Sequence, residues 1–536
     1  MSIEIGPITF ELGSIELIFI VLVVATALAY LARAIRVAEP ILFVLGGVVL
    51  GLVLGIAPEL PRFALDPDLV FLLFLPPILF AAAYFTPIRD LRANRRPILL
   101  LAVGLVLFTT VVVGVVAHTL TGMSWAVAFT LGAIVAPPDA VAATAVLRRL
   151  GVGRRIVTVL EGESLFNDAT SLIAYRAGIV VVTTGVFSLA DATVGFVVVG
   201  LGGIGVGIIV GAIVTRALFK TADPTLEIVV TLLAPISAYL AAESLGMSGV
   251  LATVTAGLIT GRRAARVLSP QARLLGVGAW TTVIFFIHAF VFMLIGLQLP
   301  SIVEGLSQYS TGELLWFGVA ISLAVIVTRF VWVFPAAYVP RWLSANLRAR
   351  DPYPPARDIV VVGWAGMRGV VSLAAALALP LTPEPFPERP LILYLTFCVI
   401  VATLVGQGLT LPWLVRRLGI VAPDGPTEEE VHARLAAIEA GLRRLDELAE
   451  EYPTHLPLIE QLRSEFDHEA SHVLPHADTP IDESAQEQLD HRRIRESLVA
   501  AQREAVIALR DQGVIDDQSL RRIERDLDLE ALRVAS

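Results

Sequence analysis

The sequence predicts an all-α membrane protein that crosses the bilayer about thirteen times and ends in a soluble helical tail. Of its 536 residues, 56% are hydrophobic and only 17% are charged, whereas a soluble domain has roughly half apolar and roughly a quarter charged residues. The apolar residues occur in runs of about 20, the length that an α-helix needs to cross the hydrocarbon core. Membrane β-strands are shorter and alternate polar with apolar residues, so helices rather than a barrel are predicted.

Charges, prolines and glycines divide the membrane part into separate apolar runs. The first run follows fourteen residues without Lys or Arg, so it is predicted to be a retained span and not a cleaved signal peptide. The ninth run is short, and a re-entrant segment is its alternative. The thirteen spans are expected near residues 15–33, 40–58, 68–86, 97–118, 124–147, 156–184, 191–215, 226–245, 248–261, 278–300, 312–340, 358–380 and 391–415.

The basic residues between the runs predict the orientation. When alternate loops are grouped, one side carries twenty-two Arg and Lys and the other only Arg62 and Arg389. Cytoplasmic loops collect Lys and Arg, so we expect the N-terminus outside, the C-terminus in the cytoplasm, and the protein in the cell membrane. An odd number of spans agrees with this arrangement.

The chain changes character after residue 420. Residues 421–536 hold 27 Asp and Glu and 13 Arg, with apolar residues at helical spacing. The sequence therefore predicts a membrane domain over 1–420 and a helical cytoplasmic tail, with a regulatory role, over 421–536. His468, His472 and His476 are four residues apart; a solvated face explains them best, and metal binding or pH sensing is the alternative.

Ionisable residues inside a bilayer are costly, so each one is a candidate for function. Two of them, His118 and Glu313, lie near predicted span ends, where contact with the interface explains them. The full set inside the predicted spans is His118, Asp139, Glu161, Glu163, Asp168, Arg176, Glu243, His288, Glu313, Arg329 and Arg368.

Four polar residues cluster in the sixth run. Ser164 and Asp168 are four residues apart and share one helical face, and Glu163 and Asn167 share an adjacent face. Carboxylate, hydroxyl and amide oxygens are what a small hard cation needs in place of water. The cluster predicts a cation site centred on Asp168, with helix capping or contacts inside the bundle as the alternative.

The fifth run is interrupted by Pro137 and Pro138, which remove two backbone donors and disfavour the helix before them. Non-helical backbone is tolerated at mid-membrane only where it is buried in protein or lines a cavity. Asp139 follows the break. It is expected either to cap the second half-helix or to share in ion coordination.

The twelfth run is interrupted by glycines around Arg368. Glycines weaken a helix and allow close backbone approach; those here are Gly363, Gly366 and Gly369. The two broken runs are seven spans apart and cross the membrane in opposite directions, which predicts an inverted repeat with the site at its interface. Arg368 is expected to pair with a buried acid. Glu163 is the predicted partner, which leaves Asp168 free to bind protons or cations.

Four segments together resemble the signatures of the monovalent cation:proton antiporter-1 family, which includes the bacterial NhaP-type and animal NHE-type exchangers. They are GESLFND at 162–168, APPDAVA at 136–142, WAGMRGVVSLA at 364–374 and FLPPILF at 74–80. The resemblance covers the membrane part and implies thirteen helices, a homodimer, a moving core domain and alternating access. It also implies that Asn167 and Asp168 bind the ion, with Ser164 and Asp139 as auxiliary ligands, and that Glu163 and Arg368 form a structural pair.

The chain departs from many relatives at two positions. Pro138 stands where a Thr is common, so only its backbone carbonyl is available to an ion, and Ala81 stands where a Glu is common. The resemblance implies that antiporters moving two protons per sodium have a second acid where this chain has Asn167. An amide cannot carry a proton, so we expect an electroneutral exchange of one cation, sodium in the first place, for one proton. A potassium or broad sodium, lithium and potassium exchanger is the alternative, followed by a cation channel or a sensor based on the tail. No enzyme activity, cofactor, resident metal or nucleic-acid partner is expected.

Overall fold

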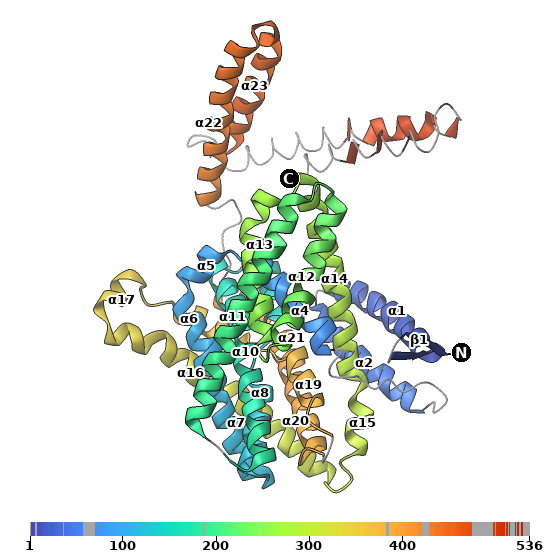
Figure 1. The fold of residues 1–536 in the computed structure, drawn as a ribbon, viewed down its shortest axis with the longest axis vertical. Coiled ribbons are helices and arrows are strands. Elements are labelled where there is room, and N and C mark those ends of the chain that lie inside the picture. The colour runs from blue at the N-terminus through green and yellow to red at the C-terminus, as the bar shows by residue number, and fades with distance from the viewer. Residues whose placement is uncertain are drawn as a thin grey trace. The chain divides into compact units, whose positions relative to one another are not determined.

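The chain divides into two compact units, Met1–Ala422 and Pro423–Ser536. The computed structural model, drawn in Figure 1, describes residues 2–5, 8–35, 37–56, 70–186, 188–381, 385–420 and 428–473, with scattered positions between 497 and 528. The first unit opens with a short antiparallel hairpin of β1 (Ser2–Ile5) and β2 (Ile8–Glu11). The elements described after the hairpin are helical, in agreement with the predicted fold class.

The first half of this unit supplies the helices on which most predicted site residues lie. Two short π-helical segments, η1 and η2, interrupt it. In chain order the elements are α1 (Leu12–Ile35), α2 (Glu39–Ile56), η1 (Val70–Phe74), α4 (Leu75–Phe85), α5 (Ile88–Ala93), α6 (Arg95–Leu99), η2 (Leu100–Leu105), α7 (Val106–Thr121), α8 (Trp125–Val135), α9 (Ala140–Arg149), α10 (Arg154–Thr184) and α11 (Leu189–Lys220).

The second half completes the bundle. Its elements are α12 (Pro224–Glu243), α13 (Gly249–Val267), α14 (Pro270–Leu297), α15 (Leu299–Glu304), α16 (Thr311–Leu343), α17 (Ala345–Arg350), α18 (Ala356–Trp364), α19 (Val370–Leu377), α20 (Arg389–Val401), the π-helical η3 (Ala402–Gln407) and α21 (Gly408–Leu418).

Eight helical stretches of the described residues are long and apolar enough to cross a membrane, and three shorter apolar helices accompany them. The eight overlap predicted spans, as do the shorter helices Phe19–Ile35, Glu39–Val53 and Leu72–Phe85. Helix α13 and the pair α18 and α19 lie where the ninth and twelfth spans were expected. The number of thirteen crossings stays a prediction. The eight are Arg95–Thr121, Trp125–Arg149, Arg154–Thr184, Thr193–Lys220, Pro224–Glu243, Pro270–Leu297, Thr311–Leu343 and Arg389–Leu418.

Two stretches of the bundle leave the helical path at mid-course. Helix α8 ends at Val135 and α9 begins at Ala140, on either side of the two prolines. Helix α18 ends at Trp364 and α19 begins at Val370. The two breaks touch, because the backbone N–H of Asp139 donates to the carbonyl of Met367 at 2.7 Å. Residues more than 200 positions apart in the sequence therefore meet at one crossing.

Small residues let the helices approach closely elsewhere. A Cβ added to Gly47 on α2 would lie 2.1 Å from the carbonyl oxygen of Met293 on α14. A Cβ on Gly261 of α13 would lie 2.2 Å from that of Tyr84 on α4. Such contacts need glycine, and they are typical of helices that pack within lipid.

The second unit contains a pair of packed helices, α22 (Glu428–Glu451) and α23 (Leu456–Val473), joined by the short 3₁₀ turn η4 (Pro453–His455). Ile438 and Leu445 of α22 and Ile459 of α23 are buried, and Arg463 pairs with Asp446 across the two helices. His468 and His472 lie on α23, but their side chains, and all of His476, fall outside the described residues.

Candidate ion-binding site

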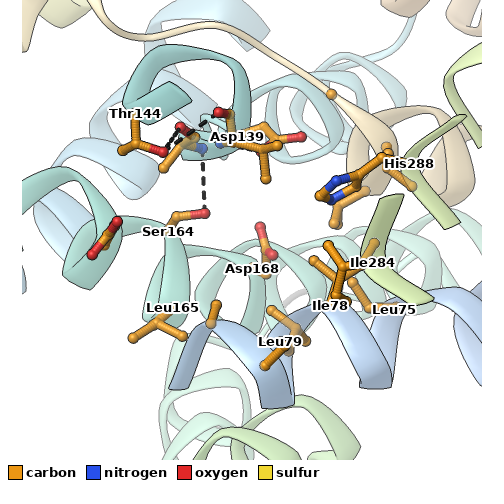
Figure 2. Close-up of a pocket in the computed structure, with 18 of the residues that line it drawn as sticks. Leu75, Ile78, Leu79, Asp139, Thr144, Ser164, Leu165, Asp168, Ile284 and His288 are labelled. Carbon is orange, nitrogen blue, oxygen red and sulfur yellow. Dashed lines mark hydrogen bonds between the residues drawn. The ribbon is translucent and has the colours of Figure 1, made fainter. Parts of the chain in front are cut away.

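The site is a cavity of about 580 Å³ beside the crossing of the two breaks. Asp168 and Ser164 of α10 reach it from one side, and Asp139 of the first break from another (Figure 2). Pro138 of the first break and His288 of α14 also line it. The apolar side chains of α4 and of α14, among them Leu75, Ile78, Leu79 and Ile284, form much of the remaining wall.

Asp168 is buried, with 6% of its surface exposed. Its carboxylate projects toward the cavity (Figure 2), and no hydrogen bond or ion pair from the described residues reaches it. A buried carboxylate without compensation is costly. A proton or a cation would compensate the charge of Asp168, and the cavity gives access to it.

The neighbouring polar groups differ in how they are engaged. Ser164, one turn before Asp168, accepts a long hydrogen bond of 3.5 Å from the backbone N–H of Ala140. On the far side of the cavity, Nε2 of His288 is buried, and no partner for it lies among the described residues. The hydroxyl of Ser164 and the carboxylate of Asp139 line the same cavity as Asp168.

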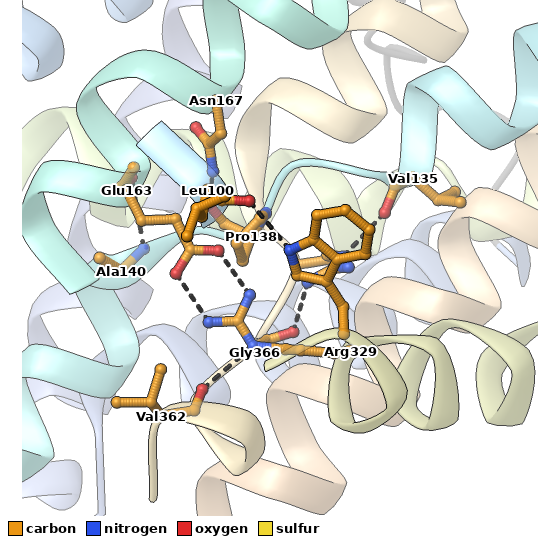
Figure 3. A network of polar contacts seen from close by, with 12 residues as sticks. Leu100, Val135, Pro138, Ala140, Glu163, Asn167, Arg329, Val362 and Gly366 are labelled. Atoms are coloured by element: carbon orange, nitrogen blue, oxygen red, sulfur yellow. Dashed lines mark hydrogen bonds and ion pairs between the residues drawn. The ribbon is translucent and has the colours of Figure 1, made fainter. Parts of the chain in front are cut away.

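Asn167 has a different place from the one expected. It is fully buried and does not line the cavity; its Nδ2 donates to the carbonyl of Pro138 at 2.8 Å (Figure 3). The amide therefore holds the free carbonyl of the first break against α10. The predicted group Asp168, Ser164, Asp139 and Pro138 does meet at one cavity, with Asn167 behind it.

Asp139 is the N-cap of α9, because its Oδ1 accepts from the backbone N–H of Val141 at 2.9 Å. Its Oδ2 lies against Gly369, the residue before α19: a Cβ there would be 2.0 Å away. Asp139 also lines the cavity. The capping alternative is thus present in the structure, and it leaves the second carboxylate oxygen at the crossing.

The predicted pair of Glu163 with Arg368 is wrong. The fully buried Arg368 donates from Nε to the carbonyl of Val135 and from Nη1 to that of Gly366, both at 2.7 Å. The carbonyl of Val135 is the last of α8, whereas that of Gly366 lies two residues past the end of α18, within the second break. The C-terminus of a helix carries partial negative charge, so the guanidinium is stabilised by the C-terminal end of α8 and by a backbone carbonyl of the second break, in place of a carboxylate.

Glu163 pairs with Arg329 of α16. The two form a bidentate ion pair at 2.6 and 2.7 Å, and each side chain is only 1% exposed (Figure 3). Nε of Arg329 also donates to the carbonyl of Val362 at 3.1 Å, which ties α16 to α18. The sequence offered one signal for this partner, an arginine in the middle of the eleventh apolar run.

The crossing is thus electrostatically balanced. Arg368 lies at the C-terminal end of α8 and past that of α18, and Asp139 at the N-terminal end of α9 and beside the start of α19. Each charge has the sign opposite to that of the helix ends near it. Asp168, which lines the same cavity as Asp139, has no such compensation within the described residues.

The family model described as "Sodium/hydrogen exchanger, transmembrane" matches residues 19–417. An uncharacterized Na+/H+ exchanger of Mycobacterium tuberculosis is 35% identical over 530 residues, which cover 97% of this chain and 96% of that protein. The Na+/H+ antiporter ApNhaP of Aphanothece halophytica is 32% identical, with 81% of each chain covered.

A solved structure has the same fold. The sodium proton antiporter MjNhaP1 from Methanocaldococcus jannaschii aligns with a TM-score of 0.60 at 19% identity, over 75% of this chain and 98% of that one. Because the family model and relatives of more than 30% identity both cover most of the membrane unit, this chain belongs to the sodium/hydrogen exchanger family of multi-pass membrane antiporters.

Proposed function

We propose that this protein exchanges a monovalent cation for a proton through the single carboxylate of Asp168. The observation that carries the proposal is the environment of that residue: a buried acid on a cavity wall, without a partner among the described residues. A proton and a cation each neutralise the carboxylate. They compete for it, and this competition couples the two fluxes.

The auxiliary oxygens follow from the cavity. Ser164 and Asp139 face the same space as Asp168 and are proposed as further ligands of the dehydrated ion. The carbonyl of Pro138 already accepts from Asn167, so it contributes only through its second lone pair. We therefore assign Asn167 a positioning role, in which it holds the broken backbone at the site.

The proposed stoichiometry is one cation for one proton. Asn167 cannot carry a proton, and Asp139 is engaged as an N-cap, which leaves Asp168 as the carrier. Sodium is the proposed cation. A relative from Bacillus subtilis, 35% identical over 381 residues, is named as a sodium, potassium, lithium and rubidium/H+ antiporter, so broad selectivity is the alternative.

The cavity is proposed to open to the cytoplasm. It extends to Arg148 and Glu161, which pair at 2.6 Å near the basic end of α9. Basic residues mark the cytoplasmic side, which also gives an outside N-terminus and a cytoplasmic C-terminus in the cell membrane. Toward the other end of α10, Arg176 pairs with Glu243 of α12 at 2.9 Å. Movement of the site between the two sides, in a homodimer, completes the proposed cycle.

The test uses purified protein in liposomes that contain a pH dye, challenged in turn with sodium, lithium and potassium. Asp168→Asn should abolish the cation-driven pH change, because an amide keeps the shape but cannot take up a proton and lacks the negative charge that balances a cation. Glu161→Gln is the matched control, since it makes the same chemical change two turns earlier on α10 and on the same cavity. Normal exchange by a folded Asp168→Asn variant would refute the assignment.

A further inference from the structure

A second cavity, of about 120 Å³, lies apart from the ion site, where α6, η2, α10, α16 and α18 meet. Three arginines line it: Arg96 at the start of α6, Arg155 at the start of α10 and Arg341 near the end of α16. The rest of the wall is mainly apolar and includes Leu100, Leu101, Val159, Val333, Ile359 and Val362. The cavity therefore combines three arginine side chains with a mainly apolar wall.

Arg96 stands out among these three. Its Nη1 and Nη2 are buried, and no hydrogen-bond partner for either lies in the described part of the chain. A guanidinium has five donors in a planar fork that matches the oxygens of a carboxylate or phosphate. Two buried donor nitrogens without acceptors are costly, so the cavity is suited to a ligand that brings oxyanion oxygens.

The acids near the cavity are engaged elsewhere. Asp351 uses Oδ1 for Arg155, at 2.7 Å, and Oδ2 for Arg341, at 2.5 Å. Asp358 lines the cavity as well, and its Oδ1 lies 3.9 Å from Nε of Arg357. Neither acid pairs with Arg96, so the positive charge at this end of the cavity is left for an external anion.

The surroundings indicate what carries that anion. Leu99, beside the cavity on α6, is 55% exposed, and Trp342 and Leu343, which follow Arg341, are 72% and 71% exposed. Large exposed apolar residues at the end of a membrane-spanning helix contact acyl chains, and tryptophan favours the headgroup level. An amphiphile could place its phosphate at Arg96 and its chains along these residues.

We propose that this cavity binds the phosphate of an anionic phospholipid, with Arg96 as its main ligand and acyl chains along Leu99 and Trp342. Basic pockets between helices on the cytoplasmic side are suited to such headgroups. The proposal is independent of the role of Asp168, and its test measures binding and not exchange.

The experiment is native mass spectrometry of the full chain in detergent, titrated with dioleoyl phosphatidylglycerol or with dioleoyl phosphatidylcholine. We expect specific retention of phosphatidylglycerol. Arg96→Gln should weaken it about tenfold, the loss of one charge-assisted hydrogen-bonding group, and Arg96→Lys should fall between, since it keeps the charge but not the fork. Arg95→Gln is the matched control, because the neighbouring Arg95 is exposed and does not line the cavity.

Two further arms separate the possible sources of phosphate. Melting temperature is measured with inorganic phosphate and with glycerophosphoglycerol, the headgroup without acyl chains. Stabilisation by the intact lipid alone supports the proposal. Equal stabilisation by inorganic phosphate would overturn the lipid assignment and indicate a soluble anion. If Arg95→Gln and Arg96→Gln lose phosphatidylglycerol equally, its retention depends on general surface charge, and the proposal of a specific site at Arg96 is refuted.

Should Arg96→Gln not fold, Leu100→Trp provides a second variant. It keeps every charge but fills part of the cavity that Leu100 lines. Reduced retention of phosphatidylglycerol is expected here too, whereas unchanged retention would refute binding in the cavity.

Discussion

Glu163 and Arg329 form a bidentate ion pair in which each side chain is only 1% exposed. Removal of one member leaves an uncompensated buried charge, which typically costs about 3 to 5 kcal/mol. Glu163→Gln and Arg329→Gln should therefore each lower the melting temperature and the folded yield markedly. The measurement is thermal unfolding in detergent, followed by intrinsic fluorescence or by loss of the monodisperse peak.

The control is an ion pair that water can reach, whose acid lies on the same helix as Glu163. Arg148 and Glu161 pair at 2.6 Å, but their side chains are 64% and 22% exposed, and such pairs contribute about 0 to 1 kcal/mol. Arg148→Gln and Glu161→Gln should melt close to the parent protein. Similar melting of all four variants would show that the buried pair has no special structural role.

At the level of residues, the sequence identified which side chains matter better than it identified their partners. The spacing of Ser164 and Asp168 on one helical face predicts their common cavity, because helical geometry is local. The partner of Glu163 is 166 positions away, and which face of α16 meets α10 depends on packing between distant helices. Arg368 misled the prediction because its partners are backbone carbonyls at the end of α8 and in the second break, which no side-chain pattern records.

At the level of elements, the crossing of the two breaks depends on a close approach at Gly369. A Cβ at this position would lie 2.0 Å from Oδ2 of Asp139, a carboxylate that α9 holds as its N-cap. Gly369→Ala should push the two breaks apart, with a loss of exchange and a lower melting temperature. Gly205→Ala on α11, where the added methyl would meet nothing within 4 Å, should behave as the parent protein.

The Gly369 prediction has a clear opposite result. A Gly369→Ala protein with parental exchange rates and stability would mean that the crossing tolerates displacement. The site would then not depend on contact between the two breaks.

Asp139→Asn separates the charge of that residue from its capping role. Asparagine caps helices about as well as aspartate, so α9 should remain intact and the melting temperature nearly unchanged. The rate should fall because the cavity loses a negative charge that attracts cations. The ratio of cations to protons should stay at one, as measured from the opposing gradients at which net flux stops; a changed ratio would identify Asp139 as a second carrier.

The elements themselves were largely predictable. Each apolar run is long enough for a helix to cross a bilayer, and Pro137 and Pro138 mark the first break. Both signals could be read from the sequence because they are local. The hydrogen bond from Asp139 to Met367 could not be predicted in the same way. It joins the backbones of two interrupted helices more than 200 residues apart, and only the folded arrangement brings them together.

At the level of the whole molecule, the proposed cycle carries the same net charge in both directions. Either occupant neutralises Asp168, so no net charge crosses the membrane with the site. Moving one uncompensated charge across a potential of 100 mV would change the free energy of that step by about 2.3 kcal/mol. Imposing a potassium-diffusion potential with valinomycin on liposomes assayed with sodium should therefore change neither the rate nor the end-point. A shift of either with voltage would contradict the one-for-one exchange.

The lone carboxylate of Asp168 also limits what the protein could achieve for a cell. Because the cation and the proton share one binding site, net exchange stops when the inside-to-outside concentration ratio of the cation equals that of the proton. A pH difference of one unit would then sustain about a tenfold cation gradient, however large the membrane voltage. A cell that relied on this protein alone could keep its cytoplasm low in the cation only while the outside was the more acidic side.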